Sequence, residues 1–287
     1  RKYGLNMVLN LHKAIGNYAD IKEKTTLFED KGLQDRFVDL WLAFEKHYAG
    51  RPDIVFELMN EVRDVPSGPW VELYERTVRE IHAINPKRMI VIGGTYWNSP
   101  AKLAELKVLD DPFVAYTFHN YEPFAFTHQR GVLQADPLYY NRAMRWPSGI
   151  EPFRDYESFV HGNSDAYPGM ETMDKDYLRQ ALQGAFDFIR THPDKILWCG
   201  EFGTIRHADI NSRENYMGDL ISILKEHGIP YCVWNYLSTP NDGNRFSLVD
   251  DVTRDFLSDD LQLACLGKGD AAARGELKYM AFNVWGN

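Results

Sequence analysis

Two glutamates stand at the ends of short apolar runs and could act together as an acid and a nucleophile. Residues 54–59 lead through Asn60 into Glu61, and residues 196–200 lead into Glu201. Apolar runs of this length beside turn residues are typical of fully buried parallel strands. Two such carboxyl groups suit the cleavage of a glycosidic bond, one as acid/base and one as nucleophile. Either glutamate alone could simply begin a solvated loop, but the matching positions of both favour chemistry.

The surrounding pattern of strands and helices predicts how these glutamates could meet. Helical periodicity predicts helices that alternate with the apolar runs, and this alternation indicates a parallel α/β fold. In a TIM-type β/α barrel all strand carboxyl ends share one face, where active sites are built. We identify six βα units instead of the eight of a closed barrel, within one predicted domain covering residues 1–287. The predicted strands cover residues 5–11, 54–60, 89–93, 113–118, 196–201 and 231–235, and the main helices cover 33–48, 70–84, 174–190 and 212–227.

Other polar and aromatic residues follow the same predicted strands, so a barrel would gather them around the two glutamates. They are His12, Asn60, Trp97, His119, Tyr121 and Trp234. Structural roles are the alternative for these residues. His119 alone could be a hydrogen-bonded structural histidine, and Trp97 could pack within its loop. Glu57 shares the strand and face of Glu61. We interpret Glu57 as a buried structural carboxylate rather than a catalyst.

Between residues 122 and 173 the sequence predicts a long loop rich in aromatic side chains. A loop of this length inside a compact domain is usually functional. The alternative is an Ω-like lid that packs on itself. The sequence therefore predicts either a substrate-contacting loop or a self-packed lid next to the strand ends.

Composition excludes several classes of protein. The chain has 287 residues, 44% of them hydrophobic and 14% aromatic, with a net charge of -9. Without a basic stripe or a long apolar run, neither nucleic-acid binding nor a membrane span is expected. No HExxH or phosphate-cradling glycine motif occurs, so we expect no metal and no cofactor. Three cysteines make no disulfide framework, and Cys199 and Cys232 are predicted to be buried small hydrophobes.

The ordered motifs resemble glycoside hydrolase family 5, the retaining cellulase and mannanase family. The matching residues, in family order, are His12, Asn60-Glu61, His119-Asn120-Tyr121, Glu201 and Trp234. Each motif is weak by itself, whereas the ordered set is specific and covers nearly the whole chain. The run from Tyr121 to Gln129 is also similar to bacterial endoglucanases of the family.

This resemblance implies a role for each matched residue. Glu61 would be the acid/base and Glu201 the nucleophile, with Tyr121 donating a hydrogen bond to Glu201. Asn60 would bind the sugar 2-OH, and His12 and His119 would bind hydroxyl groups or the carboxylate network. Two aromatic residues, Trp97 and Trp234, would be stacking platforms for glucosyl rings.

Two departures from the family pattern are visible in the sequence. Val62 stands where the family usually has proline, which we expect to change only the turn. The family's first two βα units, including a second-strand arginine that orients the nucleophile, have no counterpart. Residues 1–4 resemble the end of a helix, with Gly4 as its C-terminal cap. The resulting bare strand edges leave three possibilities: a fragment whose partner segment is not shown, six strands that close among themselves, or two chains that cover each other's open seam. Of these we expect the homodimer, because exposed apolar edges invite pairing with another chain.

We therefore expect an endo-acting retaining hydrolase of β-1,4-glucan, cellulose or mixed-linkage glucan, with a β-glucan oligo- or polysaccharide as its partner. The alternatives are a β-mannanase with the same mechanism and a catalytically impaired carbohydrate-binding fragment. Retention of both glutamates argues against the impaired fragment. The sequence shows no signal peptide and leaves the compartment open, because a mature secreted enzyme would have lost its signal; a secreted or periplasmic location is our expectation.

Overall fold

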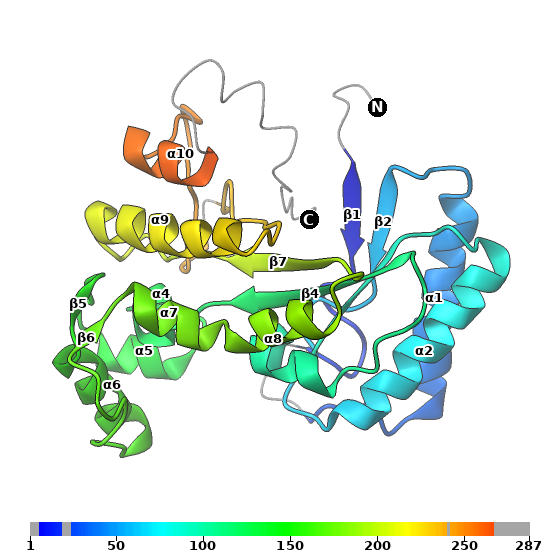
Figure 1. Ribbon diagram of the computed structural model, residues 1–287, viewed down its shortest axis with the longest axis horizontal. Helices are drawn as coiled ribbons and strands as arrows, with labels where there is room; N and C mark the ends of the chain where they lie inside the picture. The colour runs from blue at the N-terminus through cyan, green and yellow to red at the C-terminus, as the bar shows by residue number, and fades with distance from the viewer. Residues whose placement is uncertain (1–5, 19–23, 240–241, 267–287) are drawn as a thin grey trace. The chain divides into compact units, whose positions relative to one another are not determined.

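Two compact units make up the described chain, which comprises residues 6–18, 24–239 and 242–266 of the computed structural model (Figure 1). The first unit contains the described residues up to 119 together with 183–198. The second contains residues 120–182 and the described residues from 199 onward. The predicted helix end at residues 1–4 lies outside the described residues. The single domain that the sequence analysis expects stays a prediction.

A parallel sheet forms the centre of the first unit. Its strands neighbour one another in chain order and are β1 (Met7–Asn10), β2 (Ile54–Glu57), β3 (Ile90–Gly93) and β4 (Val114–Asn120). Met7 is in register with Ile54, and Ile90 is in register with Val114. The Tyr116 N–H then donates to the carbonyl of Ile196, at 2.8 Å, just before the next parallel strand begins. Parallel pairing puts the carboxyl ends of these strands at one edge of the sheet.

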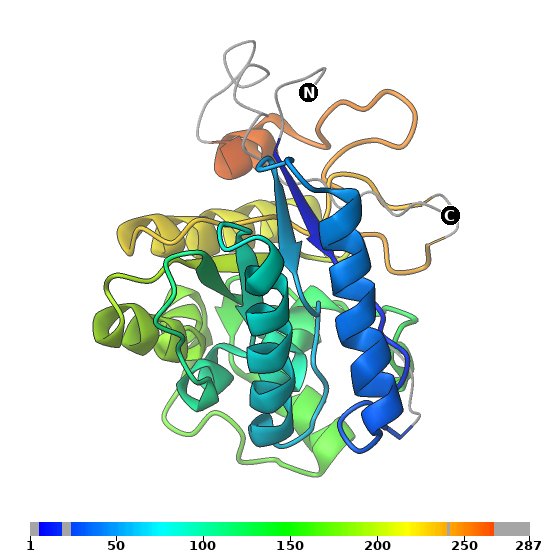
Figure 2. The same ribbon diagram turned by 90° about the vertical axis from the view of Figure 1, so that its right-hand side faces the viewer.

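Helices connect these strands. They are α1 (Lys31–His47), α2 (Ser67–Ile84), α3 (Thr95–Asn98), the 3₁₀ helix η1 (Pro100–Glu105) and α8 (Gln183–Thr191). The sequence periodicity predicts the long helices α1 and α2 but not the short α3. The long helices α1 and α2 lie side by side (Figure 2). Trp41 of α1 and Trp70 of α2 are fully buried and donate their indole N–H groups to the carbonyls of Leu58 and Gly93. Each helix is therefore fixed to the sheet by apolar burial and by one directional bond.

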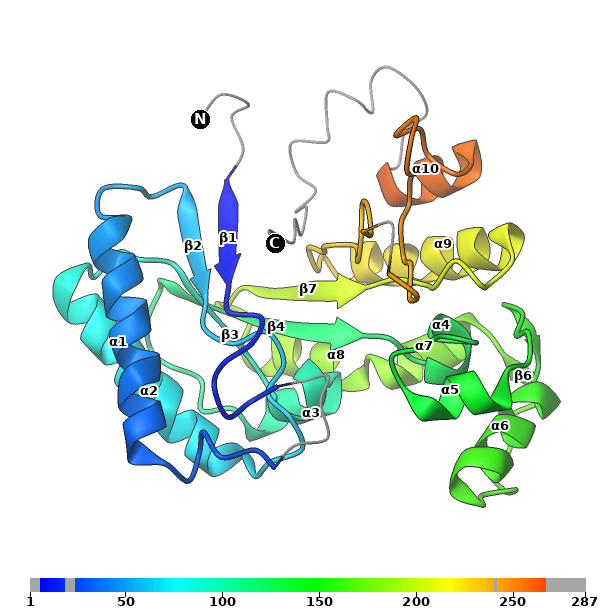
Figure 3. The ribbon, with the colours of Figure 1, turned by 180° about the vertical axis from the view of Figure 1, so that it is seen from behind.

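The second unit combines one long strand with several helices. Its elements are α4 (Phe124–Thr127), α5 (Ala135–Tyr140), β5 (Ser148–Gly149), α6 (Glu151–His161), β6 (Thr172–Met173), α7 (Lys175–Ala181), β7 (Leu197–Phe202), α9 (Ile210–Glu226) and α10 (Asp259–Leu266). The short strands β5 and β6 pair antiparallel, and both α7 and α10 pack against α9 (Figure 3). None of the helices in the described parts of the chain combines the length and apolarity that crossing a bilayer requires.

Residues 122–173 are more ordered than the loop that the sequence predicts. This segment contains three helices and both strands of the β5–β6 pair. Phe126 and Trp146 are fully buried with Tyr216 of α9, and the three ring centroids lie 5.3–5.9 Å apart. The prediction of one long loop is wrong, because the segment forms helices and strands, and several of its aromatic side chains lie in the core of the second unit.

Three predicted boundaries also differ from the structure. The predicted helix 174–190 is two helices, α7 and α8, which meet at Leu182. The N-cap of α9 is Asp209, whose carboxylate accepts from the N–H of Ser212, rather than Ser212 itself. The sixth predicted strand, 231–235, is an extended run beside β7 with a single bridge between Cys199 and Tyr231. The described residues thus contain five regular parallel strands of the barrel type, not six.

Candidate active site

Glu61 lies in an irregular segment that continues from β2 and is anchored on several sides. The N–H of Asn60 donates to the carbonyl of Leu11 at 3.0 Å. The side-chain amide of Asn17 donates to the carbonyl of Glu61 at 2.9 Å, and the N–H of Trp97 donates to the carbonyl of Val62 at 2.8 Å. These bonds replace a strand ladder, so they fix the backbone that carries Glu61 at the carboxyl end of the sheet. Val62, at the family's proline position, is fully buried there.

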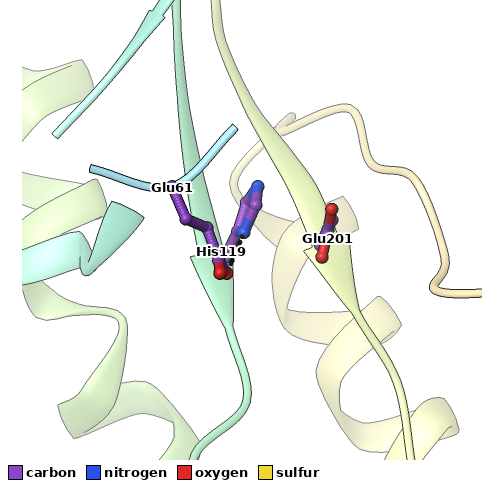
Figure 4. A group of neighbouring side chains, drawn as sticks. All are labelled: Glu61, His119 and Glu201. Atoms are coloured by element: carbon purple, nitrogen blue, oxygen red, sulfur yellow. Dashed lines mark hydrogen bonds and ion pairs between the residues drawn. The ribbon is translucent and has the colours of Figure 1, made fainter. Parts of the chain in front are cut away.

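The carboxylate of Glu61 is paired with His119, the penultimate residue of β4. His119 Nδ1 lies 2.9 Å from Glu61 Oε1, and the two side chains point toward each other (Figure 4). The side chain of His119 is 2% exposed and that of Glu61 is 17% exposed. Glu61 therefore has one oxygen held by a buried imidazole, and its side chain stays partly exposed.

Asn60 and His12 lie together beside this pair. Asn10 Nδ2 donates to Asn60 Oδ1 at 3.0 Å, which leaves the Asn60 amide nitrogen facing His12 Nε2 at 3.5 Å. Asn60 is only 1% exposed. The bond from Asn10 determines which end of the Asn60 amide is the donor toward the site.

Glu57 is buried beneath the site, as the sequence analysis expects. Burial raises the pKa of its carboxyl group, and the neighbouring charge of Glu61 raises it further, while His119 and a hydrogen bond from Asn10 oppose the shift. Its Oε1 atom has no hydrogen-bond partner among the described residues. A carboxyl group without access to solvent cannot exchange protons with a substrate easily, which supports a structural role.

Trp97 lies next to the Glu61 segment on a strained turn. It has φ 56°, its N–H bonds to the carbonyl of Val62, and 37% of its surface is exposed. This exposure leaves an aromatic surface that a sugar ring could cover. The ring also lies edge-on to that of Tyr96 in the same turn, with centroids 6.4 Å apart, so the stacking role stays a prediction.

Glu201, the penultimate residue of β7, is the second candidate carboxylate and lies in the second unit (Figure 4). It is 6% exposed, and the hydroxyl of Tyr121 donates to its Oε2 at 2.9 Å. A hydrogen bond donated to a carboxylate favours its ionised form. Tyr121 in turn packs edge-on against His128, with ring centroids 5.1 Å apart. Burial lowers the pKa of His128 to about 3, so this neighbour is neutral at any working pH.

Trp234 lies on the extended run beside β7. Its N–H donates to the carbonyl of Phe202 at 2.7 Å, and its own carbonyl comes so close to Gly203 that a Cβ there would lie 1.9 Å away. Gly203 is therefore required by a close backbone approach, directly after the strand that carries Glu201. Cys199 and Cys232 in the same region are buried, as predicted.

The structure thus brings the predicted site residues together within each unit. In the first unit Glu61 contacts His119, Asn60 lies beside His12, and Trp97 adjoins the Glu61 backbone. In the second unit Tyr121 contacts Glu201, and Trp234 lies on the neighbouring backbone run. Glu61 and His119 are also residue types that bind metals. Because they already share a hydrogen bond, they give no reason to propose an ion, and the absence of a metal or cofactor stays a prediction.

Sequence reasoning did not identify three asparagines that organise the site. Asn10 orients the amide of Asn60, Asn17 binds the carbonyl of Glu61, and Asn98 contacts both Asn60 and His119. Asparagine is common in turns and loops, so these residues resemble ordinary connections. Only Asn98 had a usable signal, since it follows Trp97 directly.

Comparison with known proteins gives a consistent result. A family profile described as "Cellulase (glycosyl hydrolase family 5)" matches residues 1–239. Endoglucanase C of Acetivibrio thermocellus is 40% identical over 242 residues, which cover 82% of this chain and 69% of that protein.

Solved structures show the same fold. Endoglucanase Cel5A of Thermotoga maritima aligns with a TM-score of 0.70 at 23% identity, over 92% of this chain and 73% of that chain. A structure of Thermotoga maritima Cel5A in complex with mannotriose aligns with a TM-score of 0.69 at 21% identity, over the same shares of both chains. The fold of this chain is therefore of the TIM-type β/α barrel class, as predicted.

Proposed function

The chain belongs to the cellulase family, glycosyl hydrolase family 5, and on that premise we propose that it is an endo-acting retaining hydrolase of β-1,4-glucan. The observation that carries this proposal is the pair of strand-end glutamates, each with its own hydrogen-bond donor. Glu61 bonds to a buried histidine, and Glu201 bonds to a tyrosine hydroxyl. Retaining glycosidases need two carboxyl groups in different environments, so that one supplies a proton while the other stays ionised.

In this mechanism the carboxylate of Glu201, to which the Tyr121 hydroxyl donates a hydrogen bond, attacks the anomeric carbon. Glu61 donates its proton to the departing glycosidic oxygen, and a covalent glycosyl-enzyme intermediate forms. Glu61 then takes a proton from water as the water attacks the same carbon from the opposite side. Two displacements at one carbon leave the β configuration unchanged.

The remaining residues would bind and orient the sugar. Asn60 would donate its amide N–H to the 2-OH, since its carbonyl oxygen already accepts from Asn10. This hydrogen bond strengthens in the transition state as the ring becomes oxocarbenium-like. His12, beside Asn60, would bind neighbouring hydroxyl groups. Trp97 and Trp234 would stack on glucosyl rings.

Substitution of each carboxylate tests the roles. Glu61→Gln and Glu201→Gln should each lower kcat by about 10²–10⁴-fold or more while the fold stays intact. Azide distinguishes the two positions. With Glu201→Ala it should give a glycosyl azide of inverted configuration, because azide replaces the missing nucleophile from the opposite face. A retained β-azide from Glu201→Ala would reverse the assignment of the two residues.

A β-mannanase with the same mechanism is the second candidate. The specific support is that Thermotoga maritima Cel5A, a protein of this fold, has been solved in complex with mannotriose. Parallel assays on carboxymethylcellulose and on mannan separate the two substrates. If both polymers stayed intact while oligosaccharides still bound, the chain would be an impaired carbohydrate-binding protein. We also propose a secreted or periplasmic location, because polymeric glucan is found outside the cell.

A further inference from the structure

The side chain of Asn98 is fully buried and contacts two parts of the proposed acid/base machinery. Its Nδ2 atom donates to the carbonyl of Asn60 and lies 3.3 Å from Nε2 of His119. On the other side of the ring, His119 Nδ1 faces Glu61 Oε1 at 2.9 Å. A continuous chain of contacts therefore leads from Asn98 through His119 to Glu61.

The contact with Asn60 determines which end of the amide faces His119. If the amide were flipped, Asn98 Oδ1 would face the carbonyl oxygen of Asn60, and two acceptors would repel each other. The nitrogen therefore faces both partners, although Oδ1 then has no partner among the described residues. Because an amide nitrogen can only donate, His119 Nε2 must be the acceptor. The ring proton then resides on Nδ1, where it donates to Glu61.

The backbone around Asn98 is arranged to keep this side chain in place. Tyr96, Trp97 and Asn98 are consecutive left-handed residues, with φ of 52°, 56° and 57°. Non-glycine residues adopt this conformation only where the surrounding structure holds them in it. The turn persists because the N–H groups of Tyr96 and Trp97 bond to the carbonyls of Arg63 and Val62.

Gly93 provides the space for Asn98. A Cβ at Gly93 would lie 2.3–2.6 Å from the amide atoms of Asn98. No side chain other than glycine fits under the Asn98 amide without displacing it. The sequence thus combines a strained turn and a close backbone approach at the residue whose amide faces His119 Nε2.

We propose that Asn98 is a positioning residue for the acid/base step: it holds His119 in the Nδ1–H tautomer, so that His119 donates to Glu61. This inference rests on the proposed role of Glu61. In the opposite tautomer, His119 Nδ1 would be an acceptor facing Glu61 Oε1. A protonated Glu61 could then donate to His119 instead of to the glycosidic oxygen. Asn98 therefore directs the catalytic proton toward the substrate.

Two substitutions test this proposal. Asn98→Asp keeps the size of the side chain and its tolerance of positive φ, but replaces both N–H donors with acceptors. It should favour the Nε2–H tautomer of His119. Asn98→Gly removes the side chain and also relieves the strain, and a water molecule can enter and still donate to His119. Asn98→Asp should therefore impair the acid step more strongly than Asn98→Gly.

The readout is kcat/KM for two substrates that differ in their need for an acid. For an unactivated cello-oligosaccharide, Asn98→Asp should lower kcat/KM by about 10–100-fold, the scale of a weakened general acid. For 2,4-dinitrophenyl β-cellobioside, whose leaving group needs no proton, kcat/KM should change less than about threefold. The control is Tyr96→Gly, which relaxes the same turn without touching His119 and should preserve both rates.

Other outcomes have distinct meanings. Equal losses on both substrates, or no loss with Asn98→Asp, would overturn the positioning role, since a structural defect does not discriminate between leaving groups. Glu61→Gln serves as the reference for the proposed function. If Glu61→Gln discriminates between the substrates and Asn98→Asp does not, only the Asn98 inference fails. If Glu61→Gln itself does not discriminate, the acid/base assignment fails. ¹⁵N NMR of the His119 ring checks the tautomer directly in each variant.

Discussion

Replacement of Tyr121 by phenylalanine removes one hydroxyl group from beside the proposed nucleophile. The hydroxyl donates to Glu201 Oε2 at 2.9 Å, while the ring packs against His128 and Phe246 with centroids 5.1 and 5.9 Å away. Phenylalanine keeps these ring contacts. The substitution therefore isolates the hydrogen bond from the packing.

The size of the effect follows from the type of bond. A hydrogen bond to a charged group contributes about 1.5–3 kcal/mol net, and about 1.4 kcal/mol corresponds to a tenfold change in rate. If the bond orients Glu201 throughout the attack, Tyr121→Phe should lower kcat/KM by about 10–150-fold. The loss of one hydroxyl with the ring in place should lower the free energy of unfolding by about 1.5–3 kcal/mol, because the same bond contributes to the stability of the fold.

The assay should report nucleophilic attack alone. Because 2,4-dinitrophenyl β-cellobioside needs no acid, its kcat/KM depends on Glu201 rather than on Glu61. Thermal unfolding of the same variant provides the control for folding. A rate within about threefold of the parent protein, with an unchanged melting temperature, would refute the role of Tyr121. A faster rate would show that the bond stabilises the ground state more than the transition state. That result would also refute the proposed role of Tyr121.

Four further predictions concern stability, binding and assembly. Gly184→Ala should destabilise the fold by about 3 kcal/mol or more, because the Cβ of the new alanine would lie 2.2 Å from the carbonyl oxygen of Pro100. Gly218 on α9 has open space around it, so Gly218→Ala should stabilise the fold by about 0.5–1 kcal/mol. Urea unfolding measures both changes. Burial lowers the pKa of His128 to about 3, so only the unfolded chain binds this proton between about pH 6.5 and 3. Stability should therefore rise with pH across that window by up to about 1.4 kcal/mol per pH unit, and a His128→Asn variant with the same slope as its parent would disprove this contribution. Trp234→Ala should weaken oligosaccharide binding more than it lowers the melting temperature; unchanged affinity with a large fall in melting temperature would make the residue part of the core. The outer edge of β1 has no strand beside it among the described residues, so the homodimer stays a prediction that light scattering decides, and an active monomer at micromolar concentration would rule it out.

The order of strands and helices could be predicted from the sequence because it depends on local pattern. Buried strands read as apolar runs, and α1 and α2 read as helical stripes that include Trp41 and Trp70. Glu61 and Glu201 stood out because a carboxylate directly after a buried run is unusual. Their order along the chain, with His119 and Tyr121 between them, then indicated the family.

Other features depend on contacts between distant residues and could not be read from local pattern. The aromatic side chains of residues 122–173 looked like loop residues, yet Trp146 is core because α9 supplies Tyr216 against it. The break at Leu182 interrupts a continuous helical stripe. The N-cap of α9 moved from Ser212 to Asp209, since both are good capping residues and only the path of the chain selects between them.

The sequence by itself therefore determined the fold class, the family and the two candidate carboxylates, because burial patterns and rare residue types are local properties. Only the tertiary structure decided how those carboxylates are held. Two distant side-chain amides donate to the Glu61 region. Asn17 lies 44 residues from its partner Glu61, and Asn98 lies 21 residues from its partner His119. A hydrogen bond requires its two atoms to meet within about 3 Å at a defined angle, and folding alone determines which distant amides satisfy that requirement.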